Sequence, residues 1–342
     1  MQATLIKNLF KKRSIQIIGV LVAVSIFIAI LLVSTKPKDY KAGTAGVPVL
    51  ITVSNGESGT AIAQDLASKS VVLKASVLIV KIIASKVAVG IAPGIHRIDT
   101  HIPSDLAITE LLDQKRIVDS INVLPGSTES DVLKLLHAAS SLKQDDQLST
   151  IKPVFSNTNN SLEGQIAPEQ YSFQPGTTTG QALSTMVKSF ADEITHTKIQ
   201  NGYLKYQPYQ LLIIASLLQI EADPGDYPKA ARVIYNRLQI GMPLQLNSTV
   251  QYAAGLRGQI GLSTASTKVD SPYNTYLHIG LPPTPISNPT LAAISATLNP
   301  ESGNWLYFIT VAPHDTRFTA SYTTFESWVV LYNKNAAAGA FK

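Results

Sequence analysis

An unbroken apolar run lies close to the N-terminus of the chain. Ile15 to Val33 contains no charged side chain and is rich in Ile, Val, Leu and Ala. As a helix that rises about 1.5 Å per residue, this run crosses most of a roughly 30 Å hydrocarbon core. It exceeds the apolar region of about 7–15 residues in a cleaved signal peptide, and a poor cleavage site follows it. The pattern therefore predicts an uncleaved transmembrane helix over residues 15–33.

Basic residues flank this run. Lys11, Lys12 and Arg13 precede it directly, which favours a cytoplasmic tail over residues 1–14. We therefore expect a single-pass protein of the cell membrane whose bulk lies outside the cytoplasm. Residues 34–47 are mostly Lys, Pro, Gly, Ala and Thr, a composition typical of a polar linker.

Two later segments share one pattern, which is a short alternating strand, a glycine turn and a Ser or Thr suited to cap a helix. The first begins at Ile51 and the second at Ile121, and apolar positions at helical spacing follow each one. A further helix is expected over about 75–84 and a further strand around 96–98. Residues 48–140 are therefore predicted to form a small α+β module.

A second domain follows a polar stretch. Ser, Asn, Thr, Gln and Asp dominate residues 141–160, which we interpret as a linker. A larger α+β domain is expected over residues 161–342, with its first clear helix between Thr177 and about Thr195. The predicted fold class is thus α+β, with one N-terminal transmembrane helix, a small module and a larger domain.

One apolar helix in the larger domain carries an acidic residue in line with its apolar positions. The helix is expected to begin at Pro208, and Glu221 lies four residues after Leu217 and three after Leu218. Apolar neighbours and the negative end of the helix dipole both disfavour the ionised carboxyl and raise its pKa. A protonated carboxyl near neutral pH is what a general acid requires, although a last-turn Glu that bends into solvent gives the same pattern.

Charge and composition exclude several classes of function. The net charge of +5 would suit nucleic acid, but residues 1–41 hold seven basic residues and one acidic residue, so the rest of the chain is close to neutral. We therefore expect no nucleic-acid partner. The lack of Cys excludes a disulfide scaffold, a thiolate metal site and a Cys nucleophile. The six His residues show no metal-binding spacing, so no metal or other cofactor is expected.

Two stretches combine amides, hydroxyls and aromatic rings with few charges. They cover residues 244–252 and 271–283, and their composition suits a neutral ligand rich in hydroxyl groups. Ordinary turns capped by Asn, Ser and Pro would give the same composition. Arg237 lies between the apolar helix and the first stretch. It falls on the polar side of its own expected helix, so exposure to solvent is enough to explain a charged residue there.

The segment from Ala215 to Pro300 resembles the endolytic murein transglycosylase family of YceG-like proteins. Ala215–Glu221 is similar to the family's catalytic helix, and Tyr235–Gln245 is similar to its Asn-Arg-Leu and Gly-Met-x-Leu-Gln motif. Ser271–Tyr276 and the Gly-Leu-Pro-Pro that follows continue the match in order. The resemblance covers nearly the whole chain, and it implies that residues 48–140 form a LysM-like module.

The resemblance also implies an activity. Glu221 corresponds to the family's catalytic acid/base, which cleaves the bond between N-acetylmuramic acid and N-acetylglucosamine inside a bacterial peptidoglycan strand and leaves a 1,6-anhydro end. Peptidoglycan strands, and the synthases that make them, are the implied partners in cell wall biogenesis. The candidate substrate-binding residues, taken from the matched motifs, are Glu163, Gln245, Asn247, Thr249, Tyr273, Asn274 and Tyr276.

Two positions depart from the family pattern. The first Glu of the family's catalytic helix is Gln219 here, and the Asp of its Asp-Pro-Thr motif is Asn247. These departures leave open an alternative, a catalytically weak protein that binds peptidoglycan or scaffolds its synthesis. A hydrolase that adds water is a third possibility, and it would leave reducing ends in place of anhydro ends.

Overall fold

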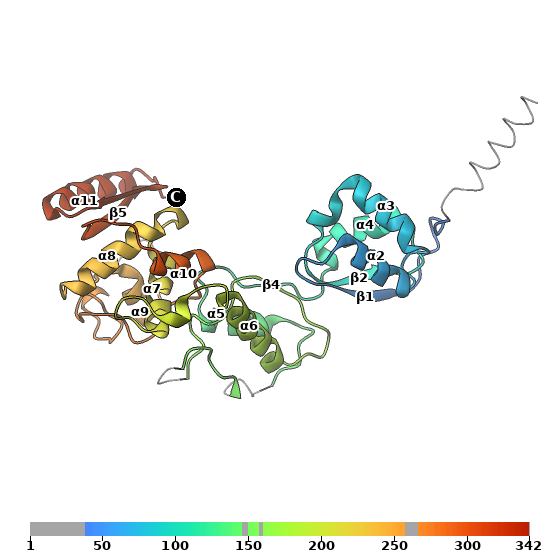
Figure 1. The fold of residues 1–342 in the computed structure, drawn as a ribbon, viewed down its shortest axis with the longest axis horizontal. Helices are drawn as coiled ribbons and strands as arrows, with labels where there is room; N and C mark the ends of the chain where they lie inside the picture. The colour runs from blue at the N-terminus through green and yellow to red at the C-terminus, as the bar shows by residue number, and fades with distance from the viewer. Residues whose placement is uncertain (1–37, 146–149, 157–159, 257–265, 342) are drawn as a thin grey trace, which may run out of the picture. The chain divides into compact units, whose positions relative to one another are not determined.

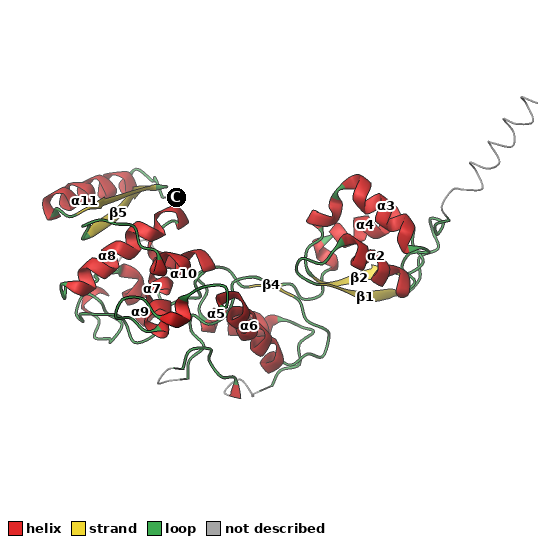
Figure 2. Ribbon diagram, viewed as in Figure 1, coloured by secondary structure: helices red, strands yellow, loops and turns green. Residues whose placement is uncertain are grey.

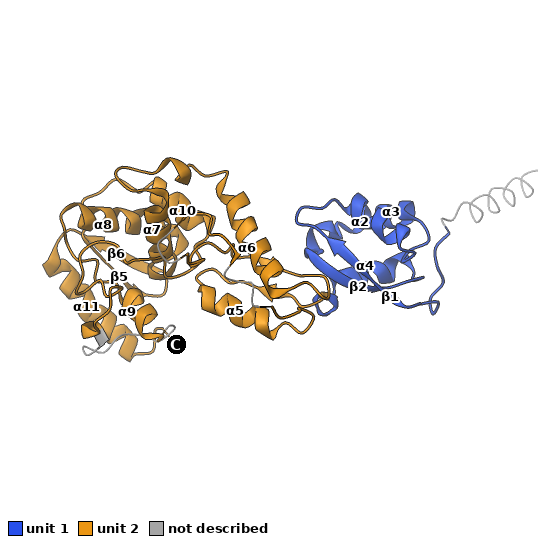
Figure 3. Ribbon diagram, turned by 90° about the horizontal axis from the view of Figure 1, so that it is seen from below, with its two compact units in different colours: residues 1–116 blue, residues 117–342 orange. Residues whose placement is uncertain are grey.

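The computed structural model describes residues 38–145, 150–156, 160–256 and 266–341. The chain divides into two compact units, Met1–Arg116 and Ile117–Lys342 (Figure 3). Both units mix helices with short two-stranded sheets, as the predicted α+β class requires (Figure 2). The transmembrane helix expected over residues 15–33 lies outside the described residues. Within the described ranges, every helix is too short or too polar to cross a membrane.

The first unit is built on one antiparallel pair of strands. β1 (Pro48–Val53) pairs with β2 (Gly94–Asp99), and the helices α2 (Gly59–Ser68), α3 (Ala75–Ser85) and α4 (Ser104–Leu112) pack with them (Figure 1). The apolar side chains that alternate along the strands meet the apolar faces of these helices in one core. The strand–helix order expected between residues 48 and 98 is therefore confirmed.

The second copy of the strand–helix pattern packs in the larger unit. β3 (Ile121–Asn122) pairs with β4 (Gln170–Tyr171), and α5 (Glu129–Ala138) packs with α6 (Thr179–Ile194). The buried side chains of α5 belong to the same apolar cluster as those of α6. The structure thus groups residues 117–140 with the larger unit, whereas the sequence pattern grouped them with the small module. The local pattern fixes each strand and helix, but the partner that covers the helix comes from elsewhere in the chain.

The helix α7 (Pro208–Glu221) forms the centre of the larger unit. It contacts α8 (Tyr227–Gln239), α9 (Asn247–Ala254) and α10 (Leu291–Leu298), and residues 211–218 are all buried (Figure 1). Pro208 stands at the start of the helix, where a missing N–H costs nothing. The apolar helix predicted from the sequence is confirmed, and its last residue is Glu221.

A hairpin and a long helix complete the larger unit. β5 (Tyr307–Ala312) pairs antiparallel with β6 (Asp315–Thr319), and α11 (Tyr322–Ala337) packs on β5. Short 3-10 helices connect the longer elements in both units, namely Val87–Gly90, Gln114–Arg116, Ile199–Asn201, Pro224–Asp226 and Ser266–Lys268.

Candidate functional site

The carboxyl group of Glu221 lies where α7 ends and α9 begins. The side chain is half-buried, and its Oε1 accepts a hydrogen bond from the backbone N–H of Ser248 at 3.2 Å. Burial raises the pKa of Glu221 above its ordinary value, and the Ser248 hydrogen bond and the positive charge of Arg237 offset only part of that rise. The helix geometry expected from the sequence therefore yields a carboxyl that holds its proton more tightly than an exposed Glu.

Arg237 on α8 supplies the positive charge near Glu221. Its side chain is 7% exposed, and its guanidinium donates from Nε to the Leu306 carbonyl at 2.5 Å and from a terminal nitrogen to the Leu244 carbonyl at 2.7 Å. The same group lies over the Tyr307 ring, 5.2 Å from the ring centroid. The expectation that Arg237 is solvated is wrong, because segments distant in the sequence cover that face of α8.

Asn247 and Tyr276, two of the predicted substrate-binding residues, meet next to Glu221. The Tyr276 hydroxyl donates to Asn247 Oδ1 at 2.6 Å, and Asn247 opens α9, directly before Ser248. The pKa of Tyr276 is raised, mainly because the hydroxyl is buried and to a smaller extent because of the charge of Glu221. Gln245 is exposed on the preceding loop, and its N–H donates to the Thr275 carbonyl at 3.0 Å. The structure therefore brings these polar groups to the same end of α7 as the carboxyl.

Thr249 and Asn274 are fully buried. The Thr249 hydroxyl donates to the Leu246 carbonyl at 2.7 Å. The Asn274 side chain donates to the carbonyl of Val269 at 2.8 Å and accepts the Tyr276 N–H at 3.0 Å. Both side chains shape the loops that carry the exposed groups, so any effect on binding would act through those loops.

Glu163 and Tyr273 meet at a second place, around Tyr252 of α9. The Tyr252 hydroxyl donates to Glu163 Oε2 at 3.0 Å, and the rings of Tyr252 and Tyr273 are 5.1 Å apart between centroids. Glu163 is 4% exposed and also accepts the backbone N–H of Glu129 at 3.2 Å, at the start of α5. Apart from the buried Thr249 and Asn274, the predicted binding residues thus form two groups, one at Glu221 and one at Tyr252.

The contacts of Gln219 explain how an amide can stand at a position where the family that this chain resembles has a Glu. Gln219 Oε1 accepts both the N–H and the hydroxyl of Thr290, each at 2.9 Å. Thr290 precedes α10 and caps it. The side chain therefore joins α7 to α10 through an acceptor oxygen, which a glutamine and a glutamate both have.

Sequence reasoning missed one further pair near Glu221. His314 Nδ1 lies 2.9 Å from Asp223 Oδ2, which links the turn after α7 to the turn between β5 and β6. Asp223 follows Glu221 by two residues, but nothing in the local pattern indicates a partner so distant in the chain. Among the described residues, His, Asp and Glu side chains form no group suited to hold a metal ion. The Glu221 carboxyl can hold and release a proton, and the site offers polar groups around it.

Comparisons with known proteins agree on one family. The chain matches the YceG-like family over residues 51–330. Over 165 residues, 48% of this chain, it is 36% identical to the endolytic murein transglycosylase of Bacillus subtilis (strain 168), of which 46% is covered. Over 155 residues, 43% of this chain, it is 37% identical to the endolytic murein transglycosylase of Streptococcus pneumoniae serotype 2 (strain D39 / NCTC 7466), of which 28% is covered. The matched segments thus span less than half the length of these relatives.

The fold has a counterpart among solved structures. A crystal structure of a yceG-like protein, lmo1499 from Listeria monocytogenes, matches with a TM-score of 0.56 over 82% of this chain and 98% of that one. The two sequences are 24% identical, so this similarity concerns the fold alone.

Proposed function

The chain belongs to the YceG-like family, and from this premise we propose that it is an endolytic lytic transglycosylase. Its substrate would be the peptidoglycan strand, cut between N-acetylmuramic acid and N-acetylglucosamine to leave a 1,6-anhydro end. Two relatives that bear the name endolytic murein transglycosylase support the activity. The observation that carries the proposal is the half-buried Glu221 carboxyl at the end of α7. Burial raises the pKa of this group.

In the proposed reaction, Glu221 acts first as an acid and then as a base. Its proton passes to the glycosidic oxygen as the bond from that oxygen to the muramic C1 breaks. The 6-hydroxyl of the same sugar then bonds to C1, and its proton returns to Glu221. No water is consumed, so the second carboxylate that ordinary glycosidases use for water or as a nucleophile is not needed. The attacking hydroxyl belongs to the substrate and has a high effective concentration.

The groups around Glu221 suit both halves of this cycle. Burial favours the protonated acid before bond cleavage. The Ser248 N–H and the Arg237 charge stabilise the carboxylate that forms after the proton has left. Tyr276 and Asn247 would orient the sugar through its hydroxyl and acetamido groups. Gln245 would contribute from the preceding loop.

The membrane anchor and the small module are part of the same proposal. An anchor over residues 15–33 would hold the enzyme at the cell membrane, with residues 1–14 as a cytoplasmic tail and the chain from residue 34 onward outside. The first unit would act as a LysM-like module that binds glycan, and synthases would be neighbours at the membrane.

Since the chain has no Cys, a single introduced cysteine reports its own location. In intact cells, a maleimide that cannot cross membranes should label Lys41→Cys and leave Lys7→Cys unlabelled. Labelling of Lys7→Cys alone would contradict this topology.

Digestion of uncrosslinked glycan strands tests the reaction. The full chain should release products with 1,6-anhydro ends, which mass spectrometry separates from reducing ends by one water. Glu221→Gln should abolish them. Glu301→Gln, an exposed site in the same unit, makes the same chemical change and should leave the rate unchanged. Strands that are bound but never cut would favour the binding or scaffolding alternative.

A further inference from the structure

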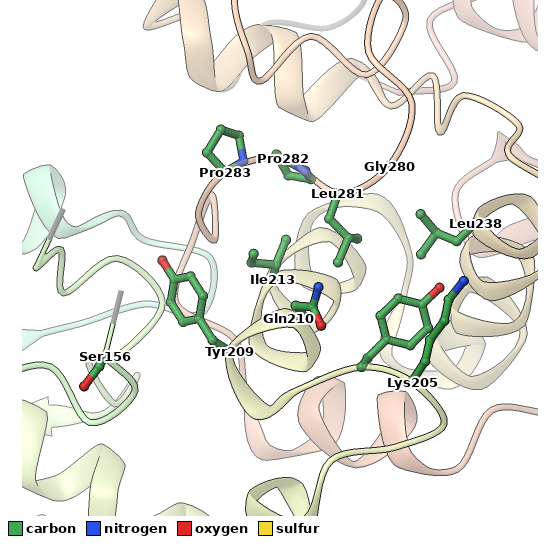
Figure 4. A pocket seen from close by; sticks show the side chains of 11 residues that line it. Ser156, Lys205, Tyr209, Gln210, Ile213, Leu238, Gly280, Leu281, Pro282 and Pro283 are labelled. Carbon is green, nitrogen blue, oxygen red and sulfur yellow. The ribbon is translucent and has the colours of Figure 1, made fainter. Parts of the chain in front are cut away.

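A cavity of about 840 Å³ opens at the other end of α7 from Glu221 (Figure 4). Its walls come from the first turns of α7, from Leu238 of α8, from the Lys205–Tyr206 segment and from residues 280–283. The volume lies within the range of about 300–1,000 Å³ that is typical of small-molecule sites. None of the residues that line the cavity belongs to the proposed reaction.

The lining of this cavity is aromatic and apolar, with a few polar groups. Tyr206 and Tyr209 supply rings, and Pro282 and Pro283 supply flat aliphatic faces. Lys205 is its one charged lining residue, and the described lining includes no acidic side chain. Sugar rings present C–H faces to aromatic and aliphatic surfaces, and their hydroxyl and acetamido groups require hydrogen-bond partners.

Gln210 and Lys205 bring nitrogen donors to the cavity. Gln210 Oε1 accepts the backbone N–H of Gln207 at 2.9 Å, so the amide oxygen is engaged, while the NH2 group has no hydrogen-bond partner within the part of the chain that the structure describes. The Gln210 side chain extends from α7 beside Ile213 and below Leu281 (Figure 4). The Lys205 ammonium lies 5.7 Å from the centroid of the Tyr206 ring and carries three donors.

The cavity shares chain segments and packing with both groups of predicted binding residues. Ile213 in its wall precedes Glu221 by eight residues on α7, a separation of about 12 Å along the helix axis. The chain segment that begins at Tyr276, beside Asn247, ends in the wall at Pro283. Tyr209 in that wall and Tyr273 pack against the same apolar cluster. Burial raises the pKa of Tyr209 to about 12, and the nearby Tyr273 and Glu163 add to this rise. A strand only a few sugar rings long would therefore span from Glu221 to the cavity.

We propose that this cavity is a distal glycan subsite, which binds an N-acetylated sugar ring a few units away from the bond that is cut at Glu221. The inference rests on the proposed function, because the strand at Glu221 supplies the ligand. Tyr206, Tyr209 and the two prolines contact the C–H faces of the ring. The Gln210 NH2 group and the Lys205 ammonium donate to acetamido and hydroxyl oxygens.

Binding of chitotetraose, an oligomer of N-acetylglucosamine without peptide, tests the subsite. The full chain carries Glu221→Gln so that turnover does not interfere, and calorimetry gives the Kd. Gln210→Trp fills the cavity and should raise the Kd about tenfold. Gln200→Trp makes the same change on an exposed residue outside the cavity and should leave the Kd unchanged.

A second pair of variants guards against misfolding at Gln210. Lys205→Ala removes an exposed donor and should also weaken binding, while Lys198→Ala, an exposed lysine outside the cavity, should not. Equal Kd values for all four variants would overturn the subsite. The subsite would also be overturned if Gln210→Trp weakened the binding of a free stem peptide and left the Kd for chitotetraose unchanged.

The outcome is separable from that of the proposed reaction. If the parent forms no anhydro ends but Gln210→Trp weakens chitotetraose binding, the subsite stands and the reaction fails. If anhydro ends form but the cavity variants leave the Kd for chitotetraose unchanged, the reaction stands and the subsite fails.

Discussion

Glu221 Oε1 and the backbone nitrogen of Ser248 are 3.2 Å apart, in a hydrogen bond that joins the last residue of α7 to the first turn of α9. An N–H donor at a helix N-terminus stabilises a carboxylate, whereas the burial of the same group favours the protonated acid. Burial is the larger effect, so the pKa of Glu221 is raised. This balance suits a group that must first release a proton and then recover it.

The raised pKa of Glu221 has a consequence for stability. A carboxyl with a higher pKa in the folded protein than in the unfolded chain destabilises the fold once the pH rises above its ordinary value of 4.5. Glu221→Gln removes this ionisation. The variant should therefore gain in Tm over the parent as the pH is raised from 4 to 8, in a calorimetric series. A Tm difference that is constant across this range would contradict the raised pKa.

Arg237 is predicted to be a structural residue as well as an electrostatic one. Arg237→Leu leaves the Leu306 and Leu244 carbonyls without their donor, which should cost about 2–4 kcal/mol in urea unfolding. Arg232 also donates to a carbonyl, that of Glu301, but its hydrogen bond is exposed. Arg232→Leu is the matched control and should cost less than about 1 kcal/mol. Equal costs for the two variants would argue against the buried role of Arg237.

Gln219 offers a test of whether its departure from the family pattern affects the fold. Gln219→Ala removes the acceptor that holds Thr290, so we expect a loss of about 1–2 kcal/mol in urea unfolding. Gln219→Glu keeps an acceptor oxygen at the same place and should recover most of that loss. If Gln219→Glu is as unstable as Gln219→Ala, the hydrogen bonds to Thr290 do not explain why an amide is accepted here.

The first unit should lose stability in mild acid because of His96. This side chain is fully buried, and burial lowers its pKa although one ring nitrogen lies 2.8 Å from the Ala92 carbonyl. Folding therefore excludes a proton that the unfolded chain binds below pH 6.5. The free energy of unfolding should fall by up to about 1.4 kcal/mol per pH unit below that value. His96→Gln should flatten this dependence in urea titrations at pH 7, 6 and 5, and an unchanged slope would rule out His96 as its cause.

Local patterns predicted the elements of the site better than its side-chain roles. The apolar spacing of α7 and its proline start placed Glu221 at the end of a buried helix, because both signals lie within a few turns of the chain. Arg237 was misjudged because Leu306, 69 residues later, covers the polar face of α8. Thr249 and Asn274 matched polar motifs, yet both are buried among loop carbonyls. A motif records which residues are needed, but only the fold shows which of them reach the surface.

The same limit applies to the division of the chain. The turn and cap after β3 were visible at Thr128, whose side chain accepts the Asp131 N–H and caps α5 as expected. The helix α6, which covers the buried face of α5, begins at Thr179. No pattern within residues 117–140 identifies that partner, so the helix was grouped with its neighbours in the sequence.

Cleavage of uncrosslinked glycan strands in water enriched in heavy oxygen tests the central claim most directly. If Glu221 takes up the proton of the sugar's own 6-hydroxyl, mass spectrometry should find 1,6-anhydro ends without heavy oxygen, and Glu221→Gln should yield none. Reducing ends that carry heavy oxygen, or equal cleavage by Glu221→Gln, would contradict the account.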